Sequence, residues 1–258
     1  MEIVNLSVEI FILLFLTGLI AGFVDSIAGG GGLIALPVLL FVGLPPQSAL
    51  GTLKLQGSFG TFTAAYNFVS KGRVSLREAL PGILFTFAGA SGGAILVQSL
   101  DPKFINPLIT LLLLAVFVYT LFSRNLGKHQ SRARMQLLPY YALFGFGLGF
   151  YDGFFGPGTG SFWTFSLMVL LGYNMVKAVG YTKVMNFTSN IVALIWFVLG
   201  GNVVYTIGLT MAAGQLIGAR IGSNLAIAGG VRIIRPIYLS VVLATIGRLL
   251  YTNFFTGT

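Results

Sequence analysis

The chain alternates long apolar stretches with short polar interruptions, and this pattern predicts a bundle of membrane-embedded helices. Five apolar stretches precede a hydrophilic stretch at 123–136, and five follow it. The predicted segments of the first half are Ile10–Val24, Leu33–Leu44, Gln47–Ser70, Ala79–Leu100 and Phe104–Phe122. Those of the second half are Leu137–Tyr151, Ser161–Tyr173, Asn174–Leu199, Val203–Ala228 and Ile233–Phe255. We therefore expect a first repeat (1–122), a basic cytoplasmic linker (123–136) and a second repeat (137–258).

Composition narrows the class of protein. Only 8% of the 258 residues are charged and 56% are hydrophobic, with a mean hydropathy of +0.92. Soluble domains carry about 25% charged residues, so this chain cannot solvate the surface of a globule. The sequence predicts an all-α integral membrane protein and excludes a cytoplasmic enzyme and a nucleic-acid-binding domain. The net charge of +9 is typical of the positive-inside bias of membrane proteins.

The two halves repeat one another in order. Asp25 in GFVDSIAGGGG corresponds to Asp152 in GFYDGFFGPGTG. Further along, Lys54 corresponds to Lys183, and at the same offset Gly51 pairs with Gly180, Gly72 with Gly201 and Pro107 with Pro236. An ordered series that includes the charged residues indicates an internal repeat.

The first two stretches of each half are short and flank a glycine-rich break. The breaks are Gly29–Gly32 in the first half and Gly156–Gly160 in the second. Short segments interrupted by Gly or Pro at corresponding positions of two halves are typical of a transporter's central site. The alternative is a pair of ordinary short helices joined by a surface turn. Each repeat is thus expected to hold one glycine-broken helix pair and three full transmembrane helices, the pairs being either re-entrant or fully crossing.

Basic loops predict the orientation. Lys71–Arg77, Arg124–Arg134 and Arg232–Arg235 carry the positive charge that marks cytoplasmic loops. The first-half counterpart of the last loop, at Asp101–Lys103, then lies outside. Equivalent loops on opposite sides indicate inverted repeats, with both chain termini extracytoplasmic.

Four charges repeat at membrane depth, where each costs from about 2.5 to over 10 kcal/mol unless it is offset. Lys54 and Lys183 each begin a polar stripe at helical spacing, which predicts a cavity-facing surface. Two ammonium groups beside two glycine breaks predict an anion site. The predicted substrate-binding residues are Lys54, Lys183, Ser58, Thr61, Asn186, Asn190, Gly30, Gly31 and Gly158. Asp25 and Asp152 are the predicted proton-coupling residues, and the aromatic surroundings of Asp152 favour it as the carrier.

Two structural alternatives stay open for the lysines. Lys54 lies early in its segment and could extend to the membrane interface. Alternatively, each lysine could pair with the aspartate of its own half, as Asp25–Lys54 and Asp152–Lys183. The spaced glycines of the Gly89–Gly93 and Gly214–Gly218 stretches favour close helix packing.

The sequence lacks the residues that most catalytic and cofactor-binding sites require. The chain has no cysteine, and its single histidine, His129, lies in the basic linker. Metal sites built from Cys and His, redox thiols and a nucleotide-binding GxxxxGK[ST] run are all missing from the sequence. We expect no cofactor, no metal and no enzymatic activity.

The charged motifs resemble a known family. GFVDSIAGGGGLIALPVLL and ALGTLKLQGSFGT in the first half, with GFYDGFFGPGTGSFW and KAVGYTKVMNFTSNIVALI in the second, are similar to the sulfite exporter TauE/SafE family. The likeness runs from about Ile10 to Leu250 and is closest to a bacterial inner-membrane branch. It implies a multi-pass transporter of small sulfur-containing anions such as sulfite, sulfoacetate or other organosulfonates.

The leading hypothesis is a secondary transporter that exports such an anion by alternating access. A passive anion channel, an ion-coupled uptake transporter and a membrane scaffold without transport activity are the alternatives. The expected partners are the anion, the lipid bilayer and a coupling proton or sodium ion, with no nucleic acid. The sequence leaves the oligomeric state open, a homodimer included.

Overall fold

A computed structural model of the chain describes residues 7–101, 103–105, 107–109, 111–112 and 133–229. Every regular element assigned within those ranges is a helix. The first half contains α1 (Val8–Ala28), α2 (Gly31–Phe41), α3 (Pro46–Ser70) and α4 (Leu76–Ser99). The second half contains α6 (Leu137–Tyr140), the π-helix η1 (Tyr141–Gly145), α7 (Phe146–Phe154), α8 (Thr159–Leu170), α9 (Met175–Leu199) and α10 (Tyr205–Gly229). The predicted segment Ile233–Phe255 and most of Phe104–Phe122 and of the linker lie outside the described residues.

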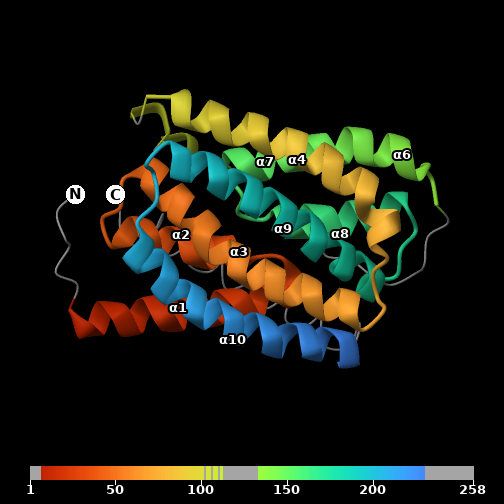
Figure 1. Cartoon of the computed structure of the whole chain (residues 1–258), viewed down its shortest axis with the longest axis horizontal. Helices are drawn as coiled ribbons and strands as arrows, with labels where there is room; N and C mark the ends of the chain where they lie inside the picture. Colours follow the sequence, from red (N-terminus) through yellow and green to blue (C-terminus); the bar gives the residue numbers. More distant parts are fainter. Residues whose placement is uncertain (1–6, 102, 106, 110, 113–132, 230–258) are drawn as a thin grey trace.

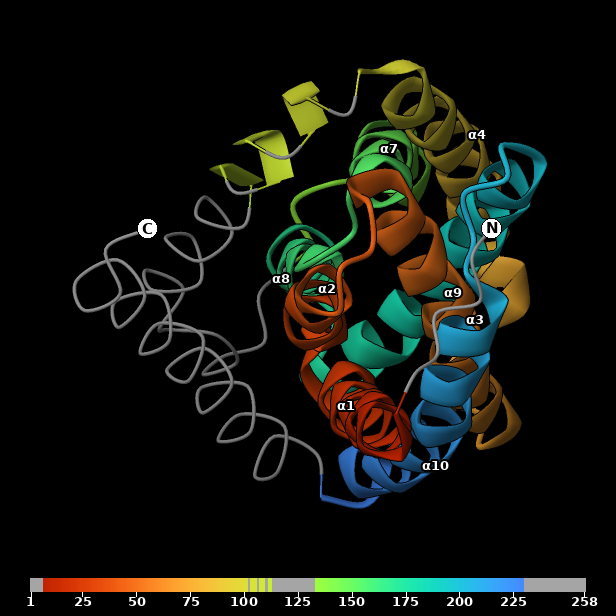
Figure 2. The ribbon, with the colours of Figure 1, turned by 90° about the vertical axis from the view of Figure 1, so that its left-hand side faces the viewer.

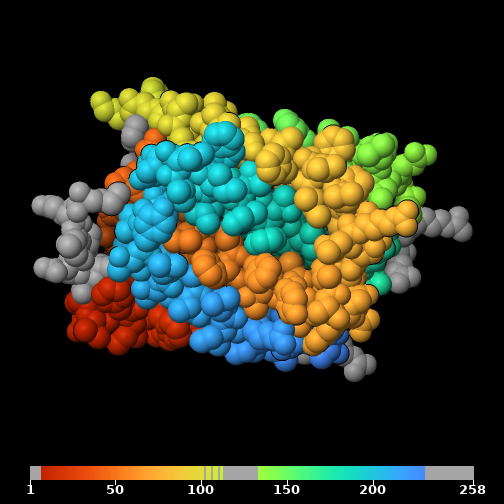
Figure 3. Space-filling model, viewed as in Figure 1, coloured from red at the N-terminus to blue at the C-terminus, as the bar shows by residue number. Residues whose placement is uncertain are grey.

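The helices have the length and composition of membrane spans, which confirms the predicted class. Among the described residues, α1, α4 and α9 are long and apolar enough to cross a membrane. Helices α3, α4, α9 and α10 form most of the face in Figure 3, with α1 along its lower left edge. Large exposed apolar side chains on these helices include Phe62, Leu84, Phe87, Ile195 and Ile217. Such a surface suits lipid rather than water.

Helices from the two halves pack against each other rather than forming separate bundles. Figure 2 shows α1 beside α10 on one side and α4 beside α7 on the other, with α3 and α9 between them. Glycines permit the closest approaches: a Cβ at Gly18 of α1 would collide with the Met211 carbonyl of α10. A Cβ at Gly89 of α4 would likewise collide with the Phe146 carbonyl of α7. The predicted role of the spaced glycines in helix packing is confirmed.

The predicted lengths are correct for the second helix of each broken pair and wrong for the first. Helices α2 and α8 have 11 and 12 residues, or about 17–18 Å at 1.5 Å per residue. Helix α1, however, has 21 residues, and α6, η1 and α7 follow one another without a gap from Leu137 to Phe154. The sequence prediction ended α1 at the charge of Asp25. The helix continues through Asp25 because a lysine from another helix neutralises its carboxylate.

Candidate functional site

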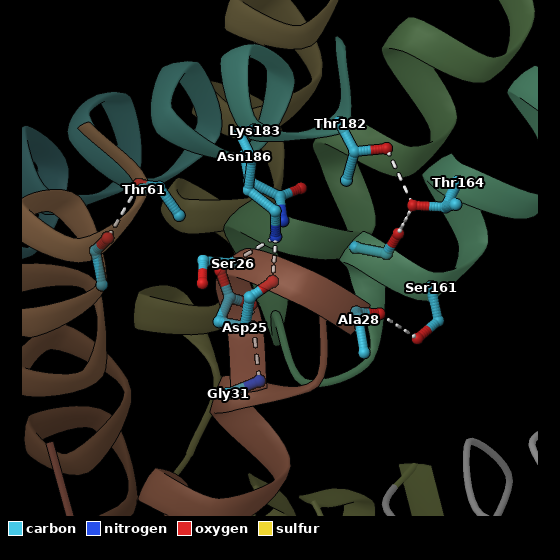
Figure 4. Close-up of polar contacts among 12 residues, drawn as sticks. Asp25, Ser26, Ala28, Gly31, Thr61, Ser161, Thr164, Thr182, Lys183 and Asn186 are labelled. Carbon is cyan, nitrogen blue, oxygen red and sulfur yellow. Dashed lines mark hydrogen bonds and ion pairs between the residues drawn. The ribbon is translucent and has the colours of Figure 1, made fainter. Parts of the chain in front are cut away.

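The two glycine breaks meet inside the protein. Gly29 ends α1 in the left-handed conformation, at a φ of 78°, and Gly158 precedes α8 at a φ of 85°. A Cβ at Gly29 would lie 2.5 Å from the Gly160 carbonyl carbon, so a larger residue would force the breaks apart. The Ser161 hydroxyl donates a hydrogen bond to the Ala28 carbonyl at 3.1 Å, which Figure 4 shows. The breaks therefore form one shared centre.

Each buried lysine contacts the end of the helix that precedes a break. The Lys54 ammonium on α3 donates to the Asp152 carbonyl, two residues before the end of α7, at 2.5 Å. The Lys183 ammonium on α9 donates to the Asp25 carbonyl near the end of α1. These carbonyls lie in the last turn of a helix, where the dipole is negative and a cation is stabilising.

The same ammonium groups form ion pairs that join the two halves. Lys54 Nζ lies 2.7 Å from Asp152 Oδ1, and Lys183 Nζ lies 3.1 Å from Asp25 Oδ2. The predicted alternative of pairs within each half is therefore wrong. Helical spacing shows which side chains share one face of a helix, but not which other helix packs against that face. Here the helix that supplies the carboxylate belongs to the other repeat. The interface alternative for Lys54 is also wrong, because its side chain is 1% exposed and ion-paired.

The two breaks and both carboxylates line a small cavity of about 40 Å³. This is room for a few water-sized groups, at about 10–15 Å³ each. Eight predicted site residues are in the lining: Asp25, Gly31, Lys54, Thr61, Asp152, Gly158, Asn186 and Asn190. Gly30, Ser58 and Lys183 are not in it. Gly30 is the N-cap of α2, Ser58 donates to the Lys54 carbonyl at 2.7 Å, and Lys183 is paired with Asp25.

Sequence reasoning missed three polar residues at this site. Gln56 and Gln215 line the cavity, and the Gln215 amide donates to the Gln56 side-chain carbonyl. Ser189 donates its hydroxyl to Asp152 Oδ2. The sequence signal that could have identified Gln56 and Gln215 is an amide side chain within an apolar segment. Ser189 lies next to the predicted α9 stripe, so helical spacing alone did not select it.

The arrangement is suited to binding rather than to bond-breaking chemistry. Two ammonium groups and two carboxylates balance in charge around the cavity. The N-cap residues of α2 and α8 are Gly30 and Gly158, which have no side chain to cap these helices, and both positive helix ends are at the cavity. Within the described residues, no three His, Cys, Asp or Glu side chains gather to hold a metal ion.

Comparison with known proteins shows the family to which the chain is similar. The family model "Sulfite exporter TauE/SafE" matches residues 14–249. A "Probable membrane transporter protein" of Haemophilus influenzae is 39% identical over 247 residues, covering 96% of this chain and 97% of the relative. The Escherichia coli "Probable membrane transporter protein YfcA" is 40% identical over 240 residues, covering 93% and 89%.

A more distant relative and a search of solved structures complete the comparison. The Bacillus subtilis "Probable membrane transporter protein YdhB" is 26% identical over 218 residues, covering 83% of this chain and 88% of the relative. No solved structure matches this chain. The family model spans nearly the whole sequence, and the relatives are transporters rather than enzymes. The chain therefore belongs to the sulfite exporter TauE/SafE family and is a membrane transporter.

Proposed function

We propose that this protein is a secondary transporter that exports a small sulfur-containing oxyanion across the bacterial inner membrane by alternating access. The observation that carries the proposal is that both buried ion pairs at the cavity join one half of the chain to the other. A movement of one half against the other must change these pairs, and with them the cavity that they line. The cavity therefore lies at the interface between the two halves, where alternating access requires the binding site to be.

The packing of the helices supports two inverted repeats. Helix α1 packs against α10, and α7, its counterpart in the second half, packs against α4. This reciprocal exchange is what a pseudo-two-fold axis between the halves would produce. Helices α3 and α9, which carry the two lysines, also pack against each other. Alternating access then consists of one repeat rocking against the other around the site.

The charges of the cavity indicate how an anion would bind. An anion that contacts Lys183 competes with the carboxylate of Asp25 for the same ammonium group. A proton on that carboxylate would release the lysine, so proton binding and anion binding favour each other. This coupling favours a second candidate function, proton-driven uptake, because a proton and an anion would then move in the same direction. Export would instead use the inside-negative membrane potential that expels anions.

Flux in proteoliposomes tests the proposal. Vesicles that contain the purified protein and labelled sulfite should release the anion with saturable kinetics, and unlabelled sulfite on the opposite side should accelerate the exchange. An inside-negative potential should speed release if the protein exports, and an inward proton gradient should speed entry if it takes up the anion. The control variant Lys103→Gln removes one positive charge and should leave this flux unchanged, because Lys103 is exposed and not in the cavity lining. Flux that neither saturates nor responds to the opposite-side anion would indicate a channel.

The inverted arrangement has its own test. Leu76 and Tyr205 begin the equivalent helices α4 and α10, and they are similarly exposed, at 53% and 52%. The native chain has no cysteine, so Leu76→Cys and Tyr205→Cys introduce single thiols. A membrane-impermeant maleimide should label the first only from the cytoplasmic side and the second only from outside. Labelling of both from one side would rule out inverted repeats.

A further inference from the structure

The Asn186 side chain carries a buried hydrogen-bond acceptor that has no partner among the residues that the structure describes. Asn186 lies on α9, is 5% exposed and lines the cavity. Its Oδ1 atom is buried without a hydrogen-bond donor. Figure 4 shows the Asn186 and Lys183 side chains extending from α9 toward Asp25. Because buried polar atoms are nearly always hydrogen-bonded, an unpaired acceptor at a cavity marks a place for a donor that enters the cavity, from water or from a ligand.

Several polar groups near Asn186 have partners among the described residues. The two lysines are paired with carboxylates, and the Thr61 hydroxyl donates to the Gly57 carbonyl at 2.7 Å. Gln215 donates to Gln56 across the cavity. Of the fully buried side-chain atoms without a partner among these residues, only Asn186 Oδ1 belongs to the cavity lining, and the interaction it lacks is a donor. An oxyanion without hydrogen has only acceptors to offer and leaves Asn186 Oδ1 unpaired.

The charge balance points in the same direction. Two ammonium groups and two carboxylates leave this buried cavity without net charge. A dianion would add two uncompensated charges, whereas an anion that retains one proton adds a single charge. The energy of an uncompensated buried charge rises steeply, so the singly charged form is favoured.

We infer that the site binds its oxyanion in the singly protonated form, with the substrate O–H donating to Asn186 Oδ1. This inference rests on the proposed function and specifies the substrate class: a small hydrogen-bearing monoanion such as hydrogen sulfite. Asn186 is then the residue that distinguishes this form from anions of equal charge that have no donor.

A matched pair of probes tests this inference. Methanesulfinate has the shape and charge of hydrogen sulfite, with a methyl group in place of the hydroxyl. The purified protein in detergent should bind hydrogen sulfite at least about tenfold more tightly, at a pH where sulfite carries one proton. In Asn186→Leu, which removes the acceptor at similar volume, hydrogen sulfite should bind about as weakly as methanesulfinate, whose own affinity is retained. Retained methanesulfinate binding also shows that the variant is folded.

The control is Thr188→Val, on the same helix. The Thr188 hydroxyl donates to the Val184 carbonyl at 2.9 Å and is not in the cavity lining, so the preference for hydrogen sulfite should persist. If Asn186→Leu does not fold, Asn186→Ala should lose the preference in the same way.

Four results would overturn the inference. A wild-type protein without preference between the probes would do so. Equal losses for both probes in Asn186→Leu would show that the amide donates to the oxygens that the probes share. Saturable transport without discrimination would refute this inference alone, whereas absence of any anion flux in the wild type would also refute the proposed function.

Discussion

The two ion pairs occupy equivalent places in the two halves, yet their carboxylates differ. Both lysine side chains are 1% exposed. Asp152, however, is 5% exposed and 2.7 Å from its ammonium partner, whereas Asp25 is 16% exposed and 3.1 Å from its own. Equivalent sequence positions have therefore produced one close, more buried pair and one looser pair with a more exposed carboxylate, and both carboxylates line the cavity.

A third contact accounts for the difference. The second oxygen of Asp152 accepts the Ser189 hydroxyl, while the second oxygen of Asp25 faces only the Gly31 N–H at 3.4 Å. Lys54–Asp152 is thus the more firmly held of the two contacts between the halves. In Lys183–Asp25 the carboxylate can leave its lysine at a lower cost. The repeated motif identifies the four charged residues, but the side chains around each pair determine how tightly its carboxylate is held.

The largest expected effect is on stability and separates the two pairs. Lys54→Met leaves Asp152 buried without its counter-charge, which should cost about 3–5 kcal/mol of unfolding free energy. Lys183→Met should cost less than about 2 kcal/mol, because water in the cavity can solvate the partly exposed Asp25. Denaturant titration of both variants in the same detergent provides the measurement.

Removal of the stranded charge is the control for this stability prediction. Lys54→Met combined with Asp152→Asn replaces the buried pair by two neutral groups and should recover most of the lost stability. If Lys183→Met is as destabilising as Lys54→Met, the two pairs are equally structural and the comparison is wrong.

The next effect concerns anion affinity and its dependence on pH. Protonation of Asp25 would release Lys183, so affinity for an anion should rise as the pH falls. Asp25→Asn resembles the protonated state at every pH: affinity at neutral pH should increase at least about tenfold and its pH dependence should disappear. Methanesulfinate is the suitable ligand, because its own charge is constant across this range. Asp152→Asn should retain the pH dependence.

The charged surroundings of Asp25 support this assignment. Lys183 of α9 contacts its carboxylate, and Lys54 of α3 and Asp152 of α7 line the same cavity. Helices α2 and α8 carry no titratable residue, and Arg220 of α10 donates to Asn67 instead. Loss of the pH dependence in Asp152→Asn alone would favour the sequence-based choice of Asp152 as the proton carrier.

Hydrophobic patterning was sufficient to locate the long helices α3 and α9. The predicted stretch Gln47–Ser70 is α3 (Pro46–Ser70), and Asn174–Leu199 is α9 (Met175–Leu199), because long apolar runs end at turn residues. Patterning also selected the four charges, since each is conspicuous in an apolar segment. It underestimated the length of α1, because a charge inside an apolar helix is tolerated only with a partner, and the sequence does not reveal that Lys183 pairs with Asp25.

Partners across the protein were beyond the reach of one sequence. Helical spacing indicated that Lys54 faces a cavity but not that its carboxylate comes from α7 of the other repeat. The Gln56–Gln215 bond joins α3 to α10, and no periodicity relates the two residues. Such contacts depend on how the repeats dock, which is settled by packing between distant segments rather than by local pattern.

The smallest effect tests the origin of the difference between the pairs. Ser189→Ala removes the hydroxyl from Asp152 Oδ2 while Lys54 retains its contacts. We expect a loss of about 1 kcal/mol in unfolding free energy, the value of one hydrogen bond. Thr188→Val is the control: its hydroxyl donates only to the Val184 carbonyl, so its loss should stay within about 0.5 kcal/mol.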